Sequence, residues 1–354
     1  MKILHTADVH LQQEGDERWD ALEQVVALGR AQEVGLLAIS GDLFDAEVDA
    51  EALRPALRAL LGGHDFPVLL LPGNHDQHAY RPGFYFGENV HVLTEAEPVS
   101  VGQVMLVGLP YRDLRGERLV ARLRQAGDTV ADADTSILLY HGELLDALPV
   151  DTERADFGPE GPARHMPVAL RYFEDVPVDY VLAGHFHSRF QEWALPGGGF
   201  FVYSGSPVSI TRRETGRRAV NLFSVGEPPR AQMLDTPHFE RVHVRLDPFA
   251  GGDPAEAVRG GLDRAHPAAK ILLEISGYMD GADLGRTEEE LAAELEALAV
   301  GCAEFTFAVR DVSRLVGTSL FAEFRQRAEQ QTDSPDRREE LTRIALRAMT
   351  EAGL

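Results

Sequence analysis

The sequence predicts an α/β fold, a two-sheet α/β/β/α sandwich followed by a small α+β domain and a helical tail. Three observations support this fold class. Buried strands alternate with amphipathic helices up to Val90, and shorter strands separated by Gly and Pro follow it. The pattern changes again near Asp235-Thr236-Pro237. Strands that alternate with helices are typical of parallel sheets whose outer faces are covered by helices.

Continuous apolar runs predict the strands, because a strand buried on both faces carries few polar residues. These runs cover residues 2–6, 35–39, 67–71, 136–139 and 179–183. Two segments with apolar residues at helical spacing, 17–33 and 50–61, lie between the first three runs. Residues 99–109, 200–203 and 219–225 predict a second, mixed sheet packed on the first. Residues 148–177 are rich in Pro, Gly and charge, and predict a long loop.

The C-terminal part predicts a βαβαβ unit and two further helices. Strands are expected at 239–246, 270–276 and 304–311, with helices at 254–266 and 288–298. Thr287 and Glu290 have the spacing of a capping box at the start of the second helix. Amphipathic segments follow at 319–330 and after Ser334-Pro335. The predicted domains are therefore residues 1–235, residues 238–313 and a tail at 314–354.

Five short polar motifs follow the five long apolar runs. They are Asp8-Val9-His10, Gly41-Asp42-Leu43-Phe44-Asp45, Gly73-Asn74-His75-Asp76, Tyr140-His141-Gly142 and Gly184-His185-Phe186-His187. In open α/β sheets, ligands bind beyond the carboxyl ends of the strands. The motifs are therefore expected to converge on one rim of the molecule.

The residue types in these motifs suit two divalent metal ions. A carboxylate such as Asp42 can bridge two ions, and imidazole, amide and carboxylate ligands without a thiolate favour Mn²⁺, Fe²⁺ or Zn²⁺. Two ions about 3.5–4 Å apart can activate water and neutralise the attacking and leaving oxygens of a phosphoryl group. His75 directly follows Asn74, so it is expected to project into the same space. There it could stabilise the phosphoryl oxygens or protonate the departing oxygen.

Each motif taken alone also has an ordinary explanation. A single Asp-x-His pair is common, and a lone His is more often a core or surface residue than a ligand. Gly-Asn-His-Asp is also a turn sequence. The occurrence of all five motifs in order, each at the end of a strand, favours the metal site.

The motif set resembles the calcineurin-like metallophosphoesterases over residues 1–225. The stretch Ile3-Leu4-His5-Thr6-Ala7-Asp8-Val9-His10-Leu11 is similar to the SbcD-type DNA repair nucleases, bacterial relatives of the meiotic-recombination-eleven nuclease, as are residues 41–45 and Tyr203-Ser204-Gly205-Ser206-Pro207. By position, the resemblance implies one metal held by Asp8, His10, Asp42 and His187. It implies a second metal held by Asp42, Asn74, His141 and His185, with His75 as the catalytic histidine. Asp45 stands where archaeal and eukaryotic members carry a second histidine, which favours the bacterial branch.

The resemblance implies a DNA nuclease that uses two Mn²⁺ ions, a 3′-to-5′ exonuclease and single-strand or hairpin endonuclease of double-strand break repair. It further implies a homodimer, and an SbcC-type SMC-like ATPase as the partner that docks on the C-terminal helices. The α+β domain is similar in element order to the DNA-capping domain of that family. One alternative is a metallophosphoesterase that acts on a cyclic nucleotide, a phosphoprotein or another small phosphoester. Another is an ATPase-regulating subunit with a vestigial metal site.

Composition adds further expectations. No apolar run is long enough to span a membrane, and the single Cys302 suits a reducing compartment, so a cytoplasmic protein without membrane contact is expected. The formal net charge is −23, and Lys2 and Lys270 are the only lysines, which is unusual for a DNA-binding protein. The densest basic cluster consists of Arg212, Arg213, Arg217 and Arg218. It could contact a phosphate backbone, or it could be a solvated turn.

Overall fold

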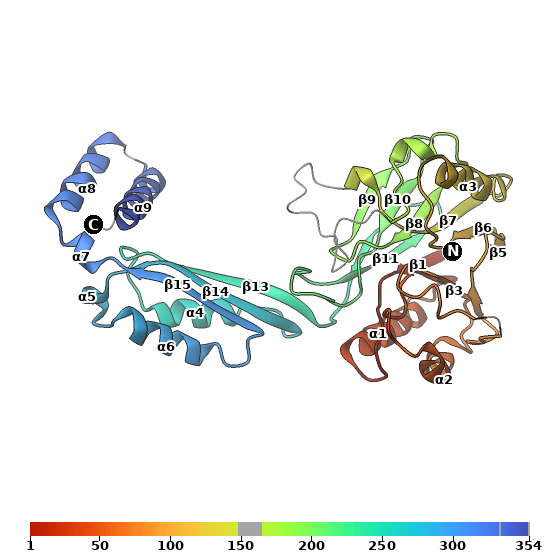
Figure 1. Ribbon diagram of the computed structural model, residues 1–354, viewed down its shortest axis with the longest axis horizontal. Coiled ribbons are helices and arrows are strands. Elements are labelled where there is room, and N and C mark those ends of the chain that lie inside the picture. Colours follow the sequence, from red (N-terminus) through yellow and green to blue (C-terminus); the bar gives the residue numbers. More distant parts are fainter. Residues whose placement is uncertain (82, 148–164, 333, 353–354) are drawn as a thin grey trace. The chain divides into compact units, whose positions relative to one another are not determined.

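The computed structural model describes residues 1–81, 83–147, 165–332 and 334–352 (Figure 1). The chain divides into two compact units, Met1–Phe239 and Glu240–Leu354. The division of the C-terminal part into a capping domain and a tail stays a prediction.

The first unit contains a six-stranded sheet in the order β12-β11-β1-β2-β3-β4. The strands are β1 (Lys2–Thr6), β2 (Leu36–Ser40), β3 (Val68–Leu71), β4 (Val90–Val92), β11 (Ala219–Ser224) and β12 (Ala231–Met233). Strands β1 to β4 are parallel, whereas β11 is antiparallel to both β1 and β12. Helices α1 (Glu17–Ala31) and α2 (Ala50–Leu61) connect the first three strands. Asp16 and Asp49 cap these helices by accepting hydrogen bonds from backbone amides.

A second six-stranded sheet has the order β5-β6-β7-β8-β10-β9. Its strands are β5 (Val99–Val101), β6 (Val104–Leu109), β7 (Thr135–His141), β8 (Tyr180–Gly184), β9 (Gln191–Ala194) and β10 (Phe200–Tyr203). Helix α3 (Gly116–Asp128) connects β6 to β7, and short 3₁₀ turns lie at Leu145–Ala147 and Leu170–Phe173. Most of the predicted long loop, residues 148–164, lies outside the described residues. In its described remainder, Val168 forms a β-bridge with Leu144.

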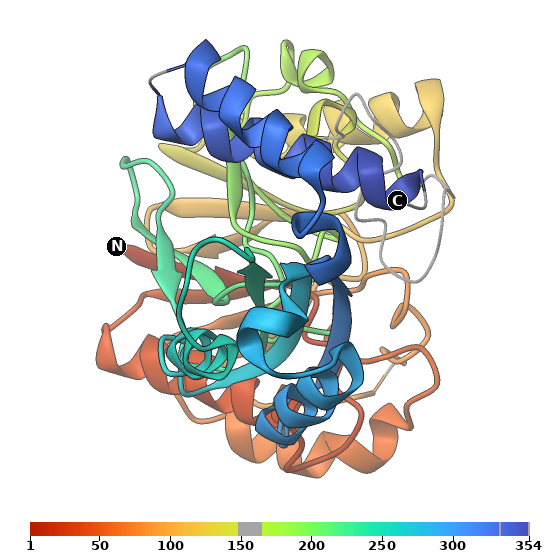
Figure 2. The ribbon, with the colours of Figure 1, turned by 90° about the vertical axis from the view of Figure 1, so that its left-hand side faces the viewer.

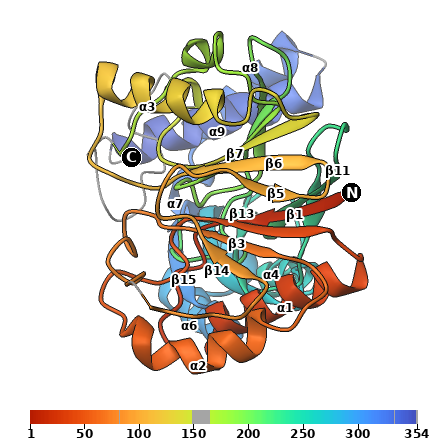
Figure 3. The same cartoon turned by 90° about the vertical axis from the view of Figure 1, so that its right-hand side faces the viewer.

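The two sheets pack face to face, with helices on both outer faces (Figure 3). Apolar side chains of both sheets form one buried cluster between them, including Ile3, Leu36, Leu69, Leu106, Ile137 and Leu182. Burying such a side chain stabilises the fold by about 1.5–3 kcal/mol. Helices α1 and α2 cover the first sheet, and α3 covers the second. The predicted α/β/β/α sandwich is confirmed.

The sequence interpretation assigned one strand to the wrong sheet and missed one helix. The segment 219–225 was expected in the second sheet, but β11 pairs with β1 in the first, with Lys2 opposite Ser224. A short apolar strand shows that it will be buried, but not which sheet edge it will join. Helix α3 buries Leu119, Leu123 and Ala126, whose helical spacing is visible in the sequence. The motif strands are consequently split, with β1 to β3 in one sheet and β7 and β8 in the other.

The second unit contains a three-stranded sheet in the order β13-β14-β15, with the last two strands parallel (Figure 2). Its elements are β13 (His238–Leu246), α4 (Pro254–Leu262), β14 (Ala269–Met279), α5 (Gly281–Leu284), α6 (Glu288–Leu298), β15 (Glu304–Asp311), α7 (Ser313–Val316), α8 (Ser319–Gln331) and α9 (Pro335–Glu351). Helices α4 and α6 pack on the sheet through Val258, Leu291 and Leu295. The capping box of Thr287 and Glu290 is present. In the described part of the chain, no helix has the length and apolar character needed to cross a bilayer.

Candidate metal centre

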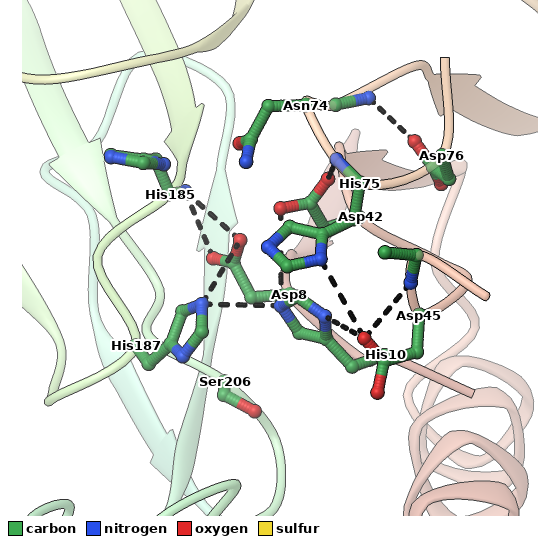
Figure 4. Close-up of polar contacts among 12 residues, drawn as sticks. Asp8, His10, Asp42, Asp45, Asn74, His75, Asp76, His185, His187 and Ser206 are labelled. Carbon is green, nitrogen blue, oxygen red and sulfur yellow. Dashed lines mark hydrogen bonds and ion pairs between the residues drawn. The ribbon is translucent and has the colours of Figure 1, made fainter. Parts of the chain in front are cut away.

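The side chains proposed as ligands gather where β1, β2, β7 and β8 end, together with the loop after β3 (Figure 4). Four of them have a positive φ, at 55° for Asp8, 53° for His10, 52° for Asp42 and 111° for His185. Such left-handed backbone conformations in residues other than glycine cost about 1–3 kcal/mol each and concentrate at functional sites. The backbone strain at the ligands therefore supports a functional centre at this rim.

Glycines allow the motif loops to approach one another closely. Gly41 has a φ of 97°, and a Cβ atom there would collide with the ring of His141. A Cβ atom at Gly73 would collide with the carboxylate of Asp42. Larger residues at these two positions would push the second, third and fourth motifs apart.

The first group of donors consists of Asp8, His10 and His187, all buried. The Nε2 atoms of His10 and His187 face each other at 3.1 Å. Nε2 of His187 lies 3.9 Å from Oδ1 of Asp8, and Nε2 of His10 lies 3.8 Å from Oδ2 of Asp42. Two imidazole nitrogens that face each other are stable only when a proton or a metal cation satisfies both lone pairs. This donor set therefore fits a divalent ion.

The second group forms around Asp42 and His141. Nε2 of His141 lies 3.1 Å from Oδ2 of Asp42 and 2.9 Å from Oδ1 of Asn74. Nδ1 of His141 donates a hydrogen bond to the carbonyl of Ser40 at 2.8 Å, which leaves Nε2 to bind a cation. Asp42 thus contacts both groups, and its bridging role stays a prediction.

His185 lies between the second group and residues that the sequence did not indicate. Its backbone N–H donates to both carboxylate oxygens of Asp8 at 3.0 Å, and its ring centroid lies 5.5 Å from that of His141. A ring nitrogen of His185, a carboxylate oxygen of Glu143 and a ring nitrogen of His165 lie within 4.8 Å of one another. No spacing rule connects His165 to the motifs, so sequence reasoning had no signal for this group.

A family model described as calcineurin-like phosphoesterase matches residues 1–189, more than half of the chain. The chain belongs to this family. The protein is therefore a metallophosphoesterase, and its buried carboxylate and imidazole groups give it a site able to hold two metal ions. The structure brings all the predicted site residues together, and their individual roles stay predictions.

Several solved structures match the chain at low sequence identity. A protein of Thermus thermophilus is 17% identical with a TM-score of 0.41, covering 62% of this chain and 92% of its own. A dimetal phosphatase from Danio rerio is 14% identical with a TM-score of 0.41, covering 62% and 91%. A purple acid phosphatase from yellow lupin is 12% identical with a TM-score of 0.39, covering 58% and 44%. No curated protein sequence matches the chain.

Asp45 lies between His75 and His10, two of the predicted site residues. Its Oδ1 lies 3.6 Å from Nδ1 of His75 and 3.7 Å from Nδ1 of His10, while Oδ2 accepts hydrogen bonds from Gln12 and Arg18 at 2.9 Å. Contact with His10, and next with His75, holds the pKa of Asp45 well below its usual range. The carboxylate of Asp45 therefore faces Nδ1 of His75.

We expect Asp45→Asn to lower turnover by about 10–100-fold, which is typical of removing a group that orients a ligand or catalytic residue. Asp45 also forms a group of possible donors with His10 and His75, but it is not among the predicted ligands, so metal content should be unchanged. Turnover at saturating metal and bound metal are measured together. Gln12→Ala is the control, because it removes a neighbour of Asp45 that contacts neither histidine. Loss of metal in Asp45→Asn would show that Asp45 acts mainly through His10.

Asp76 joins the second and third motif loops. Its buried carboxylate accepts hydrogen bonds from the backbone amides of Gly73 at 2.7 Å and Leu43 at 2.8 Å. The hydroxyl of Tyr80 donates to it at 3.0 Å. The two backbone amides would otherwise be buried without this partner, at a cost of about 1–3 kcal/mol. Asp76 therefore connects the loop that carries Asp42 to the loop that carries Asn74.

Arg218 does not belong to an exposed basic cluster, so that part of the sequence interpretation is wrong. Its side chain is buried and donates to the carbonyls of His187, of Ser188 at 2.7 Å and of Ser206 at 3.0 Å. Buried backbone carbonyls need hydrogen-bond donors, and the guanidinium group of an arginine supplies several. Of the remaining cluster, Arg217 pairs with Asp235 at 2.6 Å, while Arg212 and Arg213 are exposed.

The pKa values at the site respond to burial and to close neighbours. Burial alone would raise the pKa of Asp42, but the imidazoles of His141 and His10 lower it below its usual value. Burial opposes protonation of His141, but Asp42 outweighs it and raises the pKa of His141 from 6.5 to about 9. In the metal-free protein at neutral pH, a charged His141 therefore pairs with Asp42.

This pair predicts how metal affinity depends on pH. Because the pKa of His141 is raised on folding, the pair stabilises the metal-free protein fully below pH 6.5 and loses its effect as pH rises through about 9. An ion bound through Nε2 of His141, as the sequence predicts, would displace this proton, so we expect the affinity for a divalent ion to rise between these pH values. Calorimetric titration at pH 7 in two buffers of different ionisation enthalpy should show proton release. Equal apparent enthalpies in the two buffers would contradict this prediction.

Proposed function

We propose that this metallophosphoesterase is a two-metal DNA nuclease subunit of the SbcD type, with Mn²⁺ as its metal. Its activity would be 3′-to-5′ exonuclease and single-strand or hairpin endonuclease in double-strand break repair, in the cytoplasm. The observation that carries the proposal is the complete donor set, in which Asp42 contacts both groups of ligands.

The donor set supports hydrolysis by attack of water on a phosphodiester. When bound, two divalent ions supply the positive charge that activates water and stabilises the phosphoryl group. Asp8, His10, Asp42 and His187 would hold one ion, and Asp42, Asn74, His141 and His185 the other. His75, whose backbone N–H donates to Oδ1 of Asp42 at 2.9 Å, would donate a proton from Nε2 to the departing oxygen.

The stretch 203–207, which resembles the SbcD-type nucleases, contacts the loops that carry the ligands. The hydroxyl of Tyr203 donates to the carbonyl of Gly142 at 2.6 Å, beside His141. The backbone N–H of Ser206 donates to the carbonyl of His187 at 3.1 Å. Residues 203–207, which resemble the SbcD-type nucleases, thus support the loops that carry His141 and His187, and this favours a nuclease. The exposed Arg212 and Arg213 follow it and offer guanidinium groups to a phosphate backbone.

Partners form part of the same proposal. We place DNA as the substrate, a second copy of the chain as a partner, and an SbcC-type ATPase on the C-terminal helices. Leu320 of α8 is 52% exposed and Ile344 of α9 is 54% exposed, and exposed apolar side chains on helices suit a protein partner. ATP dependence would come from that partner, since the chain has no phosphate-binding loop motif.

A second candidate is hydrolysis of a small phosphoester such as a cyclic nucleotide. The net charge of −23 favours it, because a small substrate needs no extended basic surface. The α+β unit favours the nuclease, because it adds a compact unit beyond the catalytic sandwich.

A comparison of kcat/KM for an oligonucleotide and for a small chromogenic phosphodiester tests the proposal. The proposal predicts that the oligonucleotide is the better substrate and that it competitively inhibits turnover of the chromogenic diester. Preference for the small diester, without inhibition by the oligonucleotide, would favour the second candidate.

A further inference from the structure

Glu214 lies against the metal centre, although no motif pointed to it. It follows His187 by 27 residues, and its Oε1 accepts a hydrogen bond from Nδ1 of that ring at 3.3 Å. Glu214 is only 1% exposed. A buried carboxylate is costly to maintain, so its partners show what it does.

The other contacts of Glu214 hold the carboxylate in place. Oε2 accepts a hydrogen bond from the backbone amide of Ile210 at 2.6 Å, and Oε1 accepts one from the hydroxyl of Thr211 at 3.1 Å. The carbonyl of Glu214 accepts a further hydrogen bond from the hydroxyl of Ser209 at 2.7 Å. The loop from 209 to 214 thus closes on itself and directs one carboxylate oxygen at His187.

His187 is held at both its ring and its backbone. Arg218 donates to the carbonyls of His187 and of Ser188, so the backbone cannot shift easily. With Nδ1 donating to Glu214, the unprotonated nitrogen is Nε2, which lies 3.1 Å from Nε2 of His10 and 3.9 Å from Asp8. An imidazole binds a metal through one nitrogen while the other nitrogen is held by a hydrogen bond.

We infer that Glu214 is a positioning residue for the metal ion held by Asp8, His10 and His187, because it sets the tautomer and the ring orientation of His187. This inference rests on the proposed two-metal function. The carboxylate of Glu214 also accepts hydrogen bonds from the loop that carries Arg212 and Arg213. It therefore holds both this loop and the side chain of His187.

Titration with Mn²⁺, followed by electron paramagnetic resonance of the free ion, tests the inference. Wild type should show two Mn²⁺ sites. Glu214→Ala should weaken one site by about 10–100-fold and leave the other unchanged, as expected when the group that orients a ligand is removed. Glu214→Gln keeps the shape and an acceptor oxygen, so it should weaken the same site less. The Gln variant also serves if the Ala variant does not fold.

Two further variants separate positioning from a general structural role. Ser209→Ala loosens the same loop without touching the carboxylate, and should leave both Mn²⁺ affinities unchanged. His187→Ala should weaken the same site as Glu214→Ala, and the double variant should bind no more weakly than His187→Ala alone. Additive losses in the double variant, or an equal loss in Ser209→Ala, would overturn the inference.

The outcomes distinguish this inference from the proposed function. Wild-type protein that binds no Mn²⁺ and hydrolyses no phosphoester would overturn both. Wild type with two sites and turnover, together with unchanged affinities in Glu214→Ala and Glu214→Gln, would overturn the positioning role alone.

Discussion

Replacing Asp42 with alanine is expected to remove both metal ions and to reduce phosphoester hydrolysis by about 10³-fold or more. Oδ2 of Asp42 lies 3.1 Å from His141 and 3.8 Å from His10, so this one side chain contacts both groups of donors. A metal pair supplies several kcal/mol of charge stabilisation in the transition state, and each 1.4 kcal/mol corresponds to about a tenfold change in rate. Bound metal and turnover are measured on the same preparation.

Glu47→Ala is a suitable control for this variant, because Glu47 is an exposed acidic residue on the same loop. It should retain wild-type metal content and turnover. A thermal melt of each variant separates loss of metal from loss of fold. Two tightly bound ions in Asp42→Ala, or turnover within tenfold of wild type, would show that Asp42 does not bridge the metals.

Replacing His75 with alanine should lower turnover by about 10²–10⁴-fold, the range typical of losing a general acid. Metal content should stay at the wild-type value, because the backbone amide of His75, which donates to Asp42, is retained in the variant. The ring is only 14% exposed, and its Nδ1 lies 3.6 Å from Oδ1 of Asp45. Single-turnover rates at saturating Mn²⁺ give the size of the effect on the chemical step.

His78→Ala provides the matched control, because His78 is exposed on the same loop. It should behave as wild type in both metal content and rate. Loss of metal in His75→Ala would reassign His75 as a ligand. An unchanged single-turnover rate would exclude it from proton transfer. A substrate with a more acidic leaving group should recover much of the lost rate, since its departing oxygen needs less protonation.

The sequence predicted which residues gather at this rim because its signals are local. A continuous apolar run indicates a buried strand. Polar residues that follow it directly indicate the end of the strand where a ligand can bind, as at β1 and β2. The sandwich followed from the alternation of such strands with amphipathic helices. It was therefore possible to name Asp42 and His75 without coordinates.

Other features depend on contacts between distant segments, which spacing does not encode. Glu214 reaches His187 only because the chain turns back after β10, and His165 lies near His185 although 20 residues separate them in the sequence. Arginine is usually found at protein surfaces, yet Arg218 is buried, and no sequence motif indicates the backbone carbonyls that surround it. The pairing of β11 with β1 is likewise set by the packing of the whole unit.

Cleavage of end-labelled single-stranded and hairpin oligonucleotides with Mn²⁺ tests the central claim most directly. Wild type should shorten the single strand stepwise from its 3′ end and open the hairpin. Asp42→Ala should do neither, and His75→Ala should do both far more slowly with its metal retained. Intact oligonucleotides, alongside rapid turnover of a small phosphoester, would contradict the nuclease proposal and leave a metallophosphoesterase of another specificity.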